Sequence, residues 1–168
     1  MKAQTLTKAM LKANACFWKA TVDTDPDTGK STVKIEEWRV RSVLNRRPSE
    51  GLEPLPTAFF VKKVDGSTWV KLSPRTGDYG WASNIRGIDK ATCHLGCPLP
   101  DGMATTKYRA CERAKILHRE SRESLAKSLI RFGHSSPDDD PEYMAEVANE
   151  VAALDRAAAY WKTREKAV

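Results

Sequence analysis

The chain has 168 residues, of which 40% are hydrophobic and 30% charged, with a formal net charge of +6. This length is typical of one domain whose core needs neither a disulfide nor a metal, and the composition excludes a disordered or a repeat protein. The sequence contains no apolar run that could cross a membrane and no secretory signal after Met1, so we expect a cytoplasmic protein with reduced cysteines.

The first third of the chain predicts a long β-hairpin after a short helix over residues 5–13. Residues 16–23 and 31–44 alternate apolar and polar side chains, as strands do, and the Asp-Pro-Asp-Thr-Gly sequence at 25–29 is a strong turn signal. The alternation changes phase at Glu36-Glu37, and one extra residue in a β-bulge there would restore it.

A second hairpin is predicted after a proline-rich loop over residues 45–57. Its strands would be 58–64 and 67–72, joined by Asp65-Gly66, because an Asp-Gly pair suits the tight turn that matches the twist of two strands. The following segment, 73–104, is rich in glycine and proline and is expected to be irregular.

Two helices are predicted at the end of the chain. The first covers residues 105–132, with Thr105 or Thr106 as its cap and Gly133 after its end. The second begins after Asp140, with Pro141 in its first position. Apolar positions on the first helix form a stripe of Ala110, Ala114, Leu117, Leu125, Leu129 and Phe132, and those on the second form a seam of Met144, Val147, Val151, Leu154, Ala158 and Trp161.

Together these elements predict one α+β domain over residues 1–168. Its parts are a β-rich half (1–90), a Cys/Gly/Pro loop (91–104) and a helical hairpin (105–168). The fold would be an antiparallel sheet of about four strands, made of two hairpins, followed by an antiparallel pair of long helices. The seam over 144–161 would pack within its own chain, in a monomer, or join two chains in a homodimer.

Three cysteines and one histidine are the candidate metal ligands: Cys93, His94, Cys97 and Cys111. Zinc takes four thiolate or imidazole ligands, and these residues would attach the irregular loop to the first helix. The spacing matches no zinc-finger pattern, and the alternative is that Cys111 lies in the core while the other two are loop thiols. A cofactor-free protein is the expectation, with zinc as the alternative.

A calcium loop at Asp23, Asp25 and Asp27 is disfavoured. Gly29 stands at the seventh position of the loop instead of the sixth, and Lys34 occupies the twelfth, where a glutamate is required.

Charge is unevenly distributed along the chain. Residues 107–131 carry eight Lys/Arg and three acids, a balance of +5, whereas residues 138–168 carry eight acids and four Lys/Arg, a balance of −4. The sequence has no nucleophile elbow, phosphate-binding loop or dinucleotide motif, so we expect a protein that is not an enzyme.

A non-catalytic accessory or regulatory protein that docks on nucleic acid or on a nucleoprotein complex is therefore predicted. The alternatives are an inhibitor or adaptor that binds only protein, and a small enzyme that uses the Cys/His cluster. The segment 73–90 is the expected recognition loop. The candidate contact residues are Arg46, Arg47, Arg75, Arg113, Arg119 and Trp81.

Overall fold

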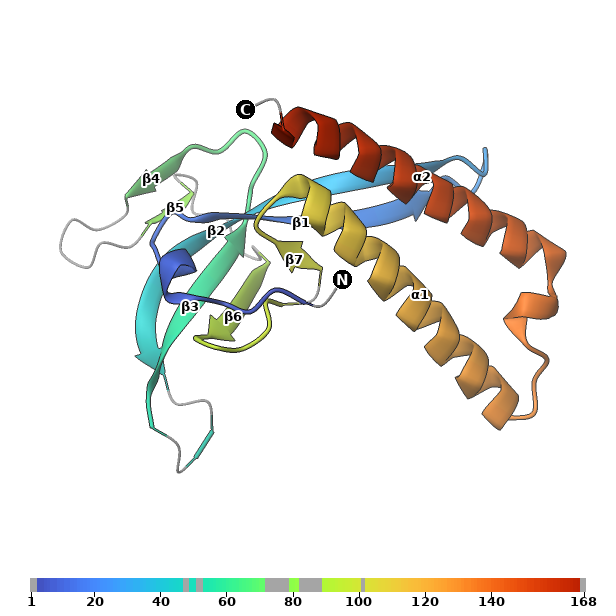
Figure 1. Ribbon diagram of the computed structural model, residues 1–168, viewed down its shortest axis with the longest axis horizontal. Coiled ribbons are helices and arrows are strands. Elements are labelled where there is room, and N and C mark those ends of the chain that lie inside the picture. Colours follow the sequence, from blue (N-terminus) through green and yellow to red (C-terminus); the bar gives the residue numbers. More distant parts are fainter. Residues whose placement is uncertain are drawn as a thin grey trace. The chain divides into compact units, whose positions relative to one another are not determined.

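The computed structural model describes residues 3–46, 49–50, 53–71, 79–81, 89–100 and 102–166 (Figure 1). Its strands and helices are β1 (Cys16–Thr24), β2 (Ser31–Arg46), β3 (Leu55–Lys62), β4 (Trp69–Lys71), β5 (Tyr79–Trp81), β6 (Lys90–His94), β7 (Met103–Ala104), α1 (Lys107–Arg131) and α2 (Pro141–Lys166). The predicted α+β class, an antiparallel sheet followed by two long helices, is confirmed. The main sheet has five strands where about four were expected. Among the described residues, no helix is long and apolar enough to span a membrane.

The chain divides into two compact units. The helical unit comprises Lys19–Ile35 and Thr106–Val168, and the sheet unit comprises Lys2–Trp18 and Glu36–Thr105. Strands β1 and β2 therefore contribute residues to both units. The single domain predicted over 1–168 stays a prediction, and each unit is described by itself.

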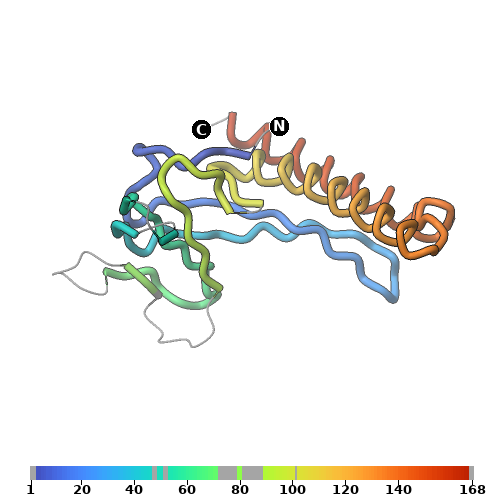
Figure 2. Tube along the Cα trace, turned by 90° about the horizontal axis from the view of Figure 1, so that it is seen from below, coloured from blue at the N-terminus to red at the C-terminus, as the bar shows by residue number. Residues whose placement is uncertain are grey.

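In the helical unit, α2 lies along the outer part of the β1–β2 hairpin, whereas α1 begins beside the C-terminal end of α2 and diverges from the hairpin toward its own C-terminal end (Figure 1 and Figure 2). The predicted caps are confirmed: the Thr106 hydroxyl accepts a hydrogen bond from the Arg109 amide at 3.2 Å, and the Asp140 carboxylate accepts one from the Glu142 amide at 2.9 Å. These bonds satisfy amides that have no partner inside the helix. Gly133 follows the end of α1 with φ of +81°, a left-handed conformation that glycine adopts without strain.

Burial along the two helices follows the predicted pattern only in part. Val147, Leu154 and Ala158 of the α2 seam are buried within the single chain, which supports intramolecular packing. On α1, however, burial is confined to the first half, at Ala110, Cys111 and Ala114. Leu125 is 46% exposed and Phe132 is 74% exposed, so the predicted apolar stripe is not buried to its end.

The sheet unit is built around strands in the order β6-β3-β2-β1-β7. One face of β2, β3 and β6 carries the core of this unit. The core residues are Leu6, Phe17, Trp38, Val40, Ala58, Phe60, Cys93, Leu99 and Met103. The rings of Phe17 and Phe60 meet edge to face, with centroids 5.1 Å apart. Burial of these side chains supplies most of the stabilisation of this unit.

The predicted second hairpin is wrong, although its turn is present. Gly66 has φ of +73° and the Ser67 amide donates to the Val64 carbonyl at 3.2 Å, but the strands on either side do not pair. Strand β3 pairs with β2 on one edge and with β6 on the other, so both of its edges are already occupied. Strand β4 pairs with β5 instead, in a separate two-stranded sheet.

Two smaller expectations also change. In the pairing of β2 with β3 the register shifts between Val40 and Ser42, so the irregularity on that side lies beyond the expected position at Glu36-Glu37. The helix expected over 5–13 is a single 3₁₀ turn at Lys8–Met10. Leu6, before this turn, is held in the core by backbone bonds to Gly96 and Cys97.

Candidate nucleic-acid interface

The sheet unit has a second face, opposite its core, that we call the outer face. Residues that lie directly opposite each other on antiparallel strands share a face, and alternate residues along a strand point to opposite faces. Because Ala58 and Phe60 point into the core, the side chains between and beside them point to the outer face. The pairings place there Arg39, Ser42, Leu44 and Arg46 of β2, Leu55, Thr57, Phe59 and Val61 of β3, and Lys90, Thr92 and His94 of β6.

Aromatic rings on this side of the unit lie against arginine side chains. The Arg46 guanidinium lies over the Phe59 ring, 5.4 Å from its centroid, and the Arg39 guanidinium lies 5.5 Å from the centroid of Trp69. Trp69 in turn stacks on Tyr79, with centroids 6.1 Å apart and ring planes 8° from parallel. These are the contacts expected between a guanidinium and the negative face of an aromatic ring.

The rings and Arg39 are half-buried, whereas Arg46 and two lysines of the sheet unit are exposed. Phe59, Trp69 and Tyr79 are each of intermediate exposure, and Arg46 is exposed. Lys90, opposite Val61 on the outer face, is exposed, as is Lys71, which stands opposite Tyr79 in the β4–β5 pair. Ser42, Thr57 and Val61 of the outer face are buried, so a partner can reach only the rest of the face, which includes Phe59, Arg46 and Lys90.

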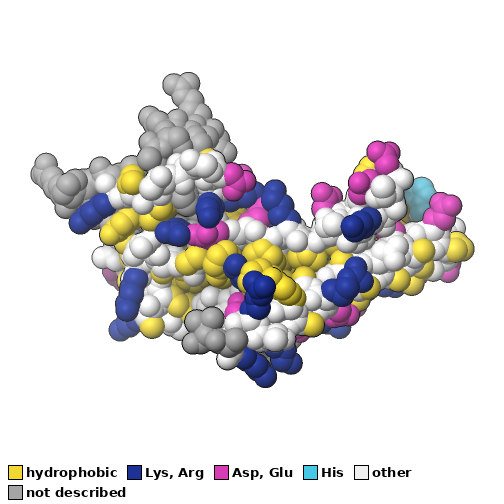
Figure 3. Space-filling view, turned by 90° about the horizontal axis from the view of Figure 1, so that it is seen from above, with side chains coloured by type: hydrophobic (Ala, Val, Ile, Leu, Met, Phe, Trp, Pro, Cys, Tyr) yellow, Lys and Arg dark blue, Asp and Glu magenta, His cyan; other side chains and the backbone are white. Residues whose placement is uncertain are grey.

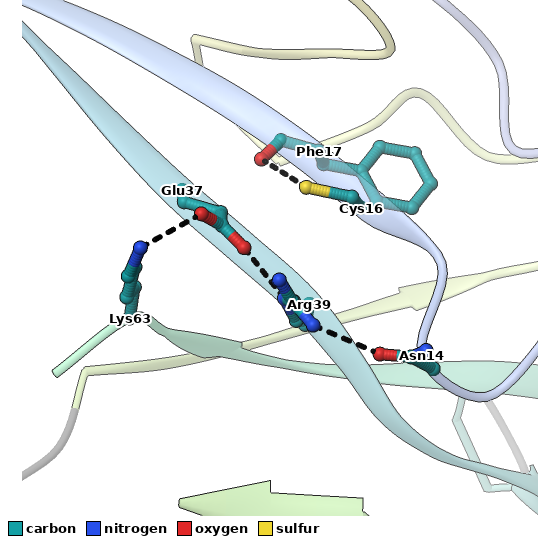
Figure 4. A network of polar contacts seen from close by, with 6 residues as sticks. All are labelled: Asn14, Cys16, Phe17, Glu37, Arg39 and Lys63. Carbon is teal, nitrogen blue, oxygen red and sulfur yellow. Dashed lines mark hydrogen bonds and ion pairs between the residues drawn. The ribbon is translucent and has the colours of Figure 1, made fainter. Parts of the chain in front are cut away.

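Arg39 is held in position by a polar network (Figure 4). Its Nε donates to the Glu37 carboxylate at 2.5 Å and its Nη1 donates to the Asn14 side-chain oxygen at 3.1 Å, while Lys63 donates to the other Glu37 oxygen at 3.3 Å. Burial alone would raise the pKa of Glu37, but the hydrogen bonds from Arg39 and Lys63 outweigh it and hold the pKa below its ordinary value of 4.5. Two cations around one carboxylate leave the network with a net positive charge.

The predicted contact residues have different outcomes. Arg46 lies on the outer face, as described above. Arg47 and Arg75 lie outside the described residues, as does most of the expected recognition loop over 73–90, and the side chain of Trp81 is not described either.

Arg113 and Arg119 belong to α1 in the helical unit, apart from the sheet unit that carries the outer face. Their ion-pair distances to glutamates on the same helix are 4.0 Å for Arg113 with Glu120 and 3.9 Å for Arg119 with Glu123. In Figure 3, lysine and arginine side chains of the described residues are interspersed with acidic ones over the face in view.

Neither Phe59 nor the arrangement of its neighbours was singled out by the sequence pattern. Arg39, Trp69 and Tyr79 belong to three different strands, and the sequence pattern alone does not show that their side chains meet. A signal for Phe59 was present in the alternation of β3, where it follows buried Ala58 and precedes buried Phe60.

The metal candidates do not form a group of ligands in the described part of the chain. There, no three His, Cys, Asp or Glu side chains lie where they could hold one metal ion. Cys93 is buried on β6 and Cys97 is exposed, while Cys111 belongs to the other unit. The His94 ring nitrogen Nδ1 makes a hydrogen bond to the Thr57 hydroxyl at 2.7 Å. Zinc binding stays the alternative to a cofactor-free protein, and a native mass spectrum compared with the denatured mass would test it.

The two buried thiols are unsuited to nucleophilic chemistry at neutral pH. Burial raises the pKa of Cys93 to about 11, and burial together with nearby Glu112 and Glu165 raises the pKa of Cys111 to about 11. Since the thiolate is the reactive form of cysteine, both are almost entirely unreactive thiols near pH 7.

The disfavoured calcium loop is a self-contained turn. The Asp25 carboxylate accepts hydrogen bonds from the backbone amides of Asp27 and Thr28, at 2.9 and 3.1 Å. This arrangement stabilises the tip of the β1–β2 hairpin.

Comparisons of the chain with protein-family models, with curated proteins and with solved structures find no match.

Proposed function

We propose that this chain is a non-catalytic accessory protein that binds single-stranded nucleic acid, free or within a nucleoprotein complex, through the outer face of its sheet unit. The observation that carries the proposal is the set of aromatic rings with guanidinium groups against them: Arg46 over Phe59, and Arg39 over the Trp69–Tyr79 stack. Exposed Lys71 and Lys90 beside these rings extend the positive charge.

The chemistry of such a surface suits a single strand. Unpaired bases expose flat π-faces that stack on aromatic side chains, and stacking is worth about 1–3 kcal/mol per base. Arginine and lysine beside the rings bind the phosphates, which also steers the encounter. Aromatic residues on the face of a sheet are used in this way by known RNA-binding modules.

Fluorescence anisotropy with a labelled single-stranded oligonucleotide tests the proposal. A strand of about 20 nucleotides exceeds the length of about 4–16 that one small domain covers. Phe59→Leu keeps an apolar side chain in the sheet and removes the ring, so it should weaken binding about 5- to 150-fold, the factor that corresponds to one stacked base. Arg46→Ala should weaken binding about fivefold.

Arg156→Ala is the matched control. Arg156 is an exposed arginine on α2, so its removal changes the net charge as Arg46→Ala does but leaves the outer face intact. The affinity of the Arg156→Ala variant for the oligonucleotide should stay within about twofold of that of the original protein. Equal affinities for Phe59→Leu, Arg46→Ala and the original protein, with unchanged melting temperatures, would contradict the proposal and favour an adaptor that binds protein alone.

A further inference from the structure

A groove runs between α1 and α2 in the helical unit, with a volume of about 440 Å³. Leu125 of α1 and Tyr143 and Val147 of α2 are the larger apolar residues of its lining. Val147 is buried, at 6% exposure, but Leu125 is 46% exposed. Leu125 belongs to the apolar stripe that the sequence predicts for α1, so the chain leaves part of that stripe uncovered at the groove.

The positive charges at this groove are already paired. His118 Nε2 lies 2.5 Å from Glu150 Oε2, and the other oxygen of Glu150 accepts a hydrogen bond from the Thr24 hydroxyl at 3.1 Å. Arg122 donates to the Asp138 carboxylate at 3.0 Å. The Arg122 guanidinium, which lines the groove, therefore has little charge left to attract an anion.

The remaining charge is negative. Glu146 lines the groove, is exposed, and makes no hydrogen bond or ion pair within the described residues. Glu146, Glu150 and the nearby Asp138 contribute three negative charges, and Arg122 contributes one positive charge. The net charge at the groove is therefore −2 when His118 is neutral. Glu146 also lies four residues from Glu142 and from Glu150 on α2, a spacing at which like charges repel and slightly destabilise a helix.

We propose that this groove docks a basic amphipathic helix from a protein partner. Apolar side chains at helical spacing on the partner would cover Leu125 and the half-buried Tyr143, and a lysine or arginine beside them would pair with Glu146. The negative charge of the groove selects a cationic guest and repels nucleic acid, so this surface is separate in chemistry from the outer face. The inference goes beyond the nucleic-acid proposal and does not depend on it.

Selection from a library of displayed random peptides tests this site without a known partner. Peptides of about 16 residues are long enough to form a helix on binding. They are selected on the full chain and counter-selected on a variant that combines Leu125→Ser with Glu146→Lys. Both positions are exposed, so each substitution is expected to leave the fold intact. A thermal melt of each variant checks this.

The selected peptides should carry Lys or Arg next to apolar residues spaced three or four apart. Synthetic copies should bind the original protein at least about fivefold more tightly than either single variant. Ile130→Ser, at a more exposed site on α1 outside the groove lining, and Glu53→Lys, with the same charge change in the sheet unit, should leave peptide affinity within about twofold.

Four results would overturn the proposal. The first is a failure to enrich any peptide, and the second is enrichment of acidic or uncharged peptides. The third is equal binding of the enriched peptides to the double variant. The fourth is a molecular mass in solution that shows a dimer for the original protein and a monomer for Leu125→Ser, because the groove would then be filled by a second copy of the chain.

Discussion

Glu165, in the last turn of α2, accepts a hydrogen bond at 2.7 Å from the backbone amide of Lys107, the first residue of α1. The same carboxylate also accepts from the Tyr108 amide, at 3.3 and 3.4 Å. The first amides of a helix have no partner inside it, and the positive end of the helix dipole favours an anion. A residue 58 positions away in sequence thus caps α1 beside the local cap at Thr106.

Removal of this cap should destabilise the protein. We expect Glu165→Ala to lower the free energy of unfolding by about 1 kcal/mol, and Glu165→Gln by less, because the amide oxygen still accepts a hydrogen bond without the charge. Urea denaturation measures both. Glu146→Ala is the control, since Glu146 is exposed on the same helix and has no partner among the described residues. Loss of its repulsion with Glu142 and Glu150 should leave stability unchanged or slightly higher. Equal stability of all three variants would show that Glu165 is not a cap.

The His118–Glu150 contact should couple the two helices energetically. Both side chains are mostly buried, at 18% and 19% exposure, so removal of one leaves the other without its partner. A double-mutant cycle with His118→Ala and Glu150→Ala should give a coupling of about 0.5–3 kcal/mol. The exposed Arg119–Glu123 pair on α1 is the control and should give at most about 0.5 kcal/mol. Equal couplings in the two cycles would contradict the arrangement of α1 against α2.

Glu37 should make stability depend on pH in the acid range. Its pKa lies below the ordinary value of 4.5 in the folded protein, because the hydrogen bonds from Arg39 and Lys63 outweigh the effect of burial. A carboxyl group with a lowered folded-state pKa stabilises the fold above its unfolded pKa, and this contribution is lost as the pH falls through the folded value. The urea midpoint should therefore fall less steeply below pH 4.5 in Glu37→Gln than in the original protein. Parallel curves for the two proteins would argue against the network.

The cysteines should differ in reactivity. Iodoacetamide at pH 8 should modify exposed Cys97 first and leave Cys93 and Cys111 intact until the protein unfolds. The cause is burial, which shields both thiols and raises their pKa to about 11. Peptide mass spectrometry at timed intervals locates the modification. Early labelling of Cys93 in the folded protein would contradict the position of β6 in the core.

Local signals predicted the two long helices well. Thr106, Asp140 and Pro141 lie where capping preferences place them, because a cap depends on residues within one helical turn. The turns at Gly29 and Gly66 were predicted for the same reason, and both have positive φ. The β1–β2 hairpin was predicted because its strands are adjacent in sequence.

Strand partners that are distant in sequence could not be predicted in this way. β3 pairs with β6, and the alternation of β3 says only that one of its faces is buried. The contact of Arg46 with Phe59 depends on the pairing of β2 with β3 across the proline-rich loop, and that of Arg39 with Trp69 joins β2 to the separate β4–β5 sheet. The alternation of single strands shows neither. The sequence therefore predicted which residue types could bind nucleic acid, and Arg46 among them, but not the surface on which they meet. The cap at Glu165 was missed for the same reason.

The salt dependence of oligonucleotide binding tests the central claim most directly. For a single strand, the logarithm of the binding constant falls with the logarithm of salt concentration, with a slope of about −0.7 for each phosphate neutralised. We predict a negative slope for the original protein that is about 0.7 shallower in Arg46→Ala and unchanged in Arg156→Ala. A flat dependence, or one that Arg46→Ala leaves unaltered, would contradict binding of nucleic acid at the outer face of the sheet unit.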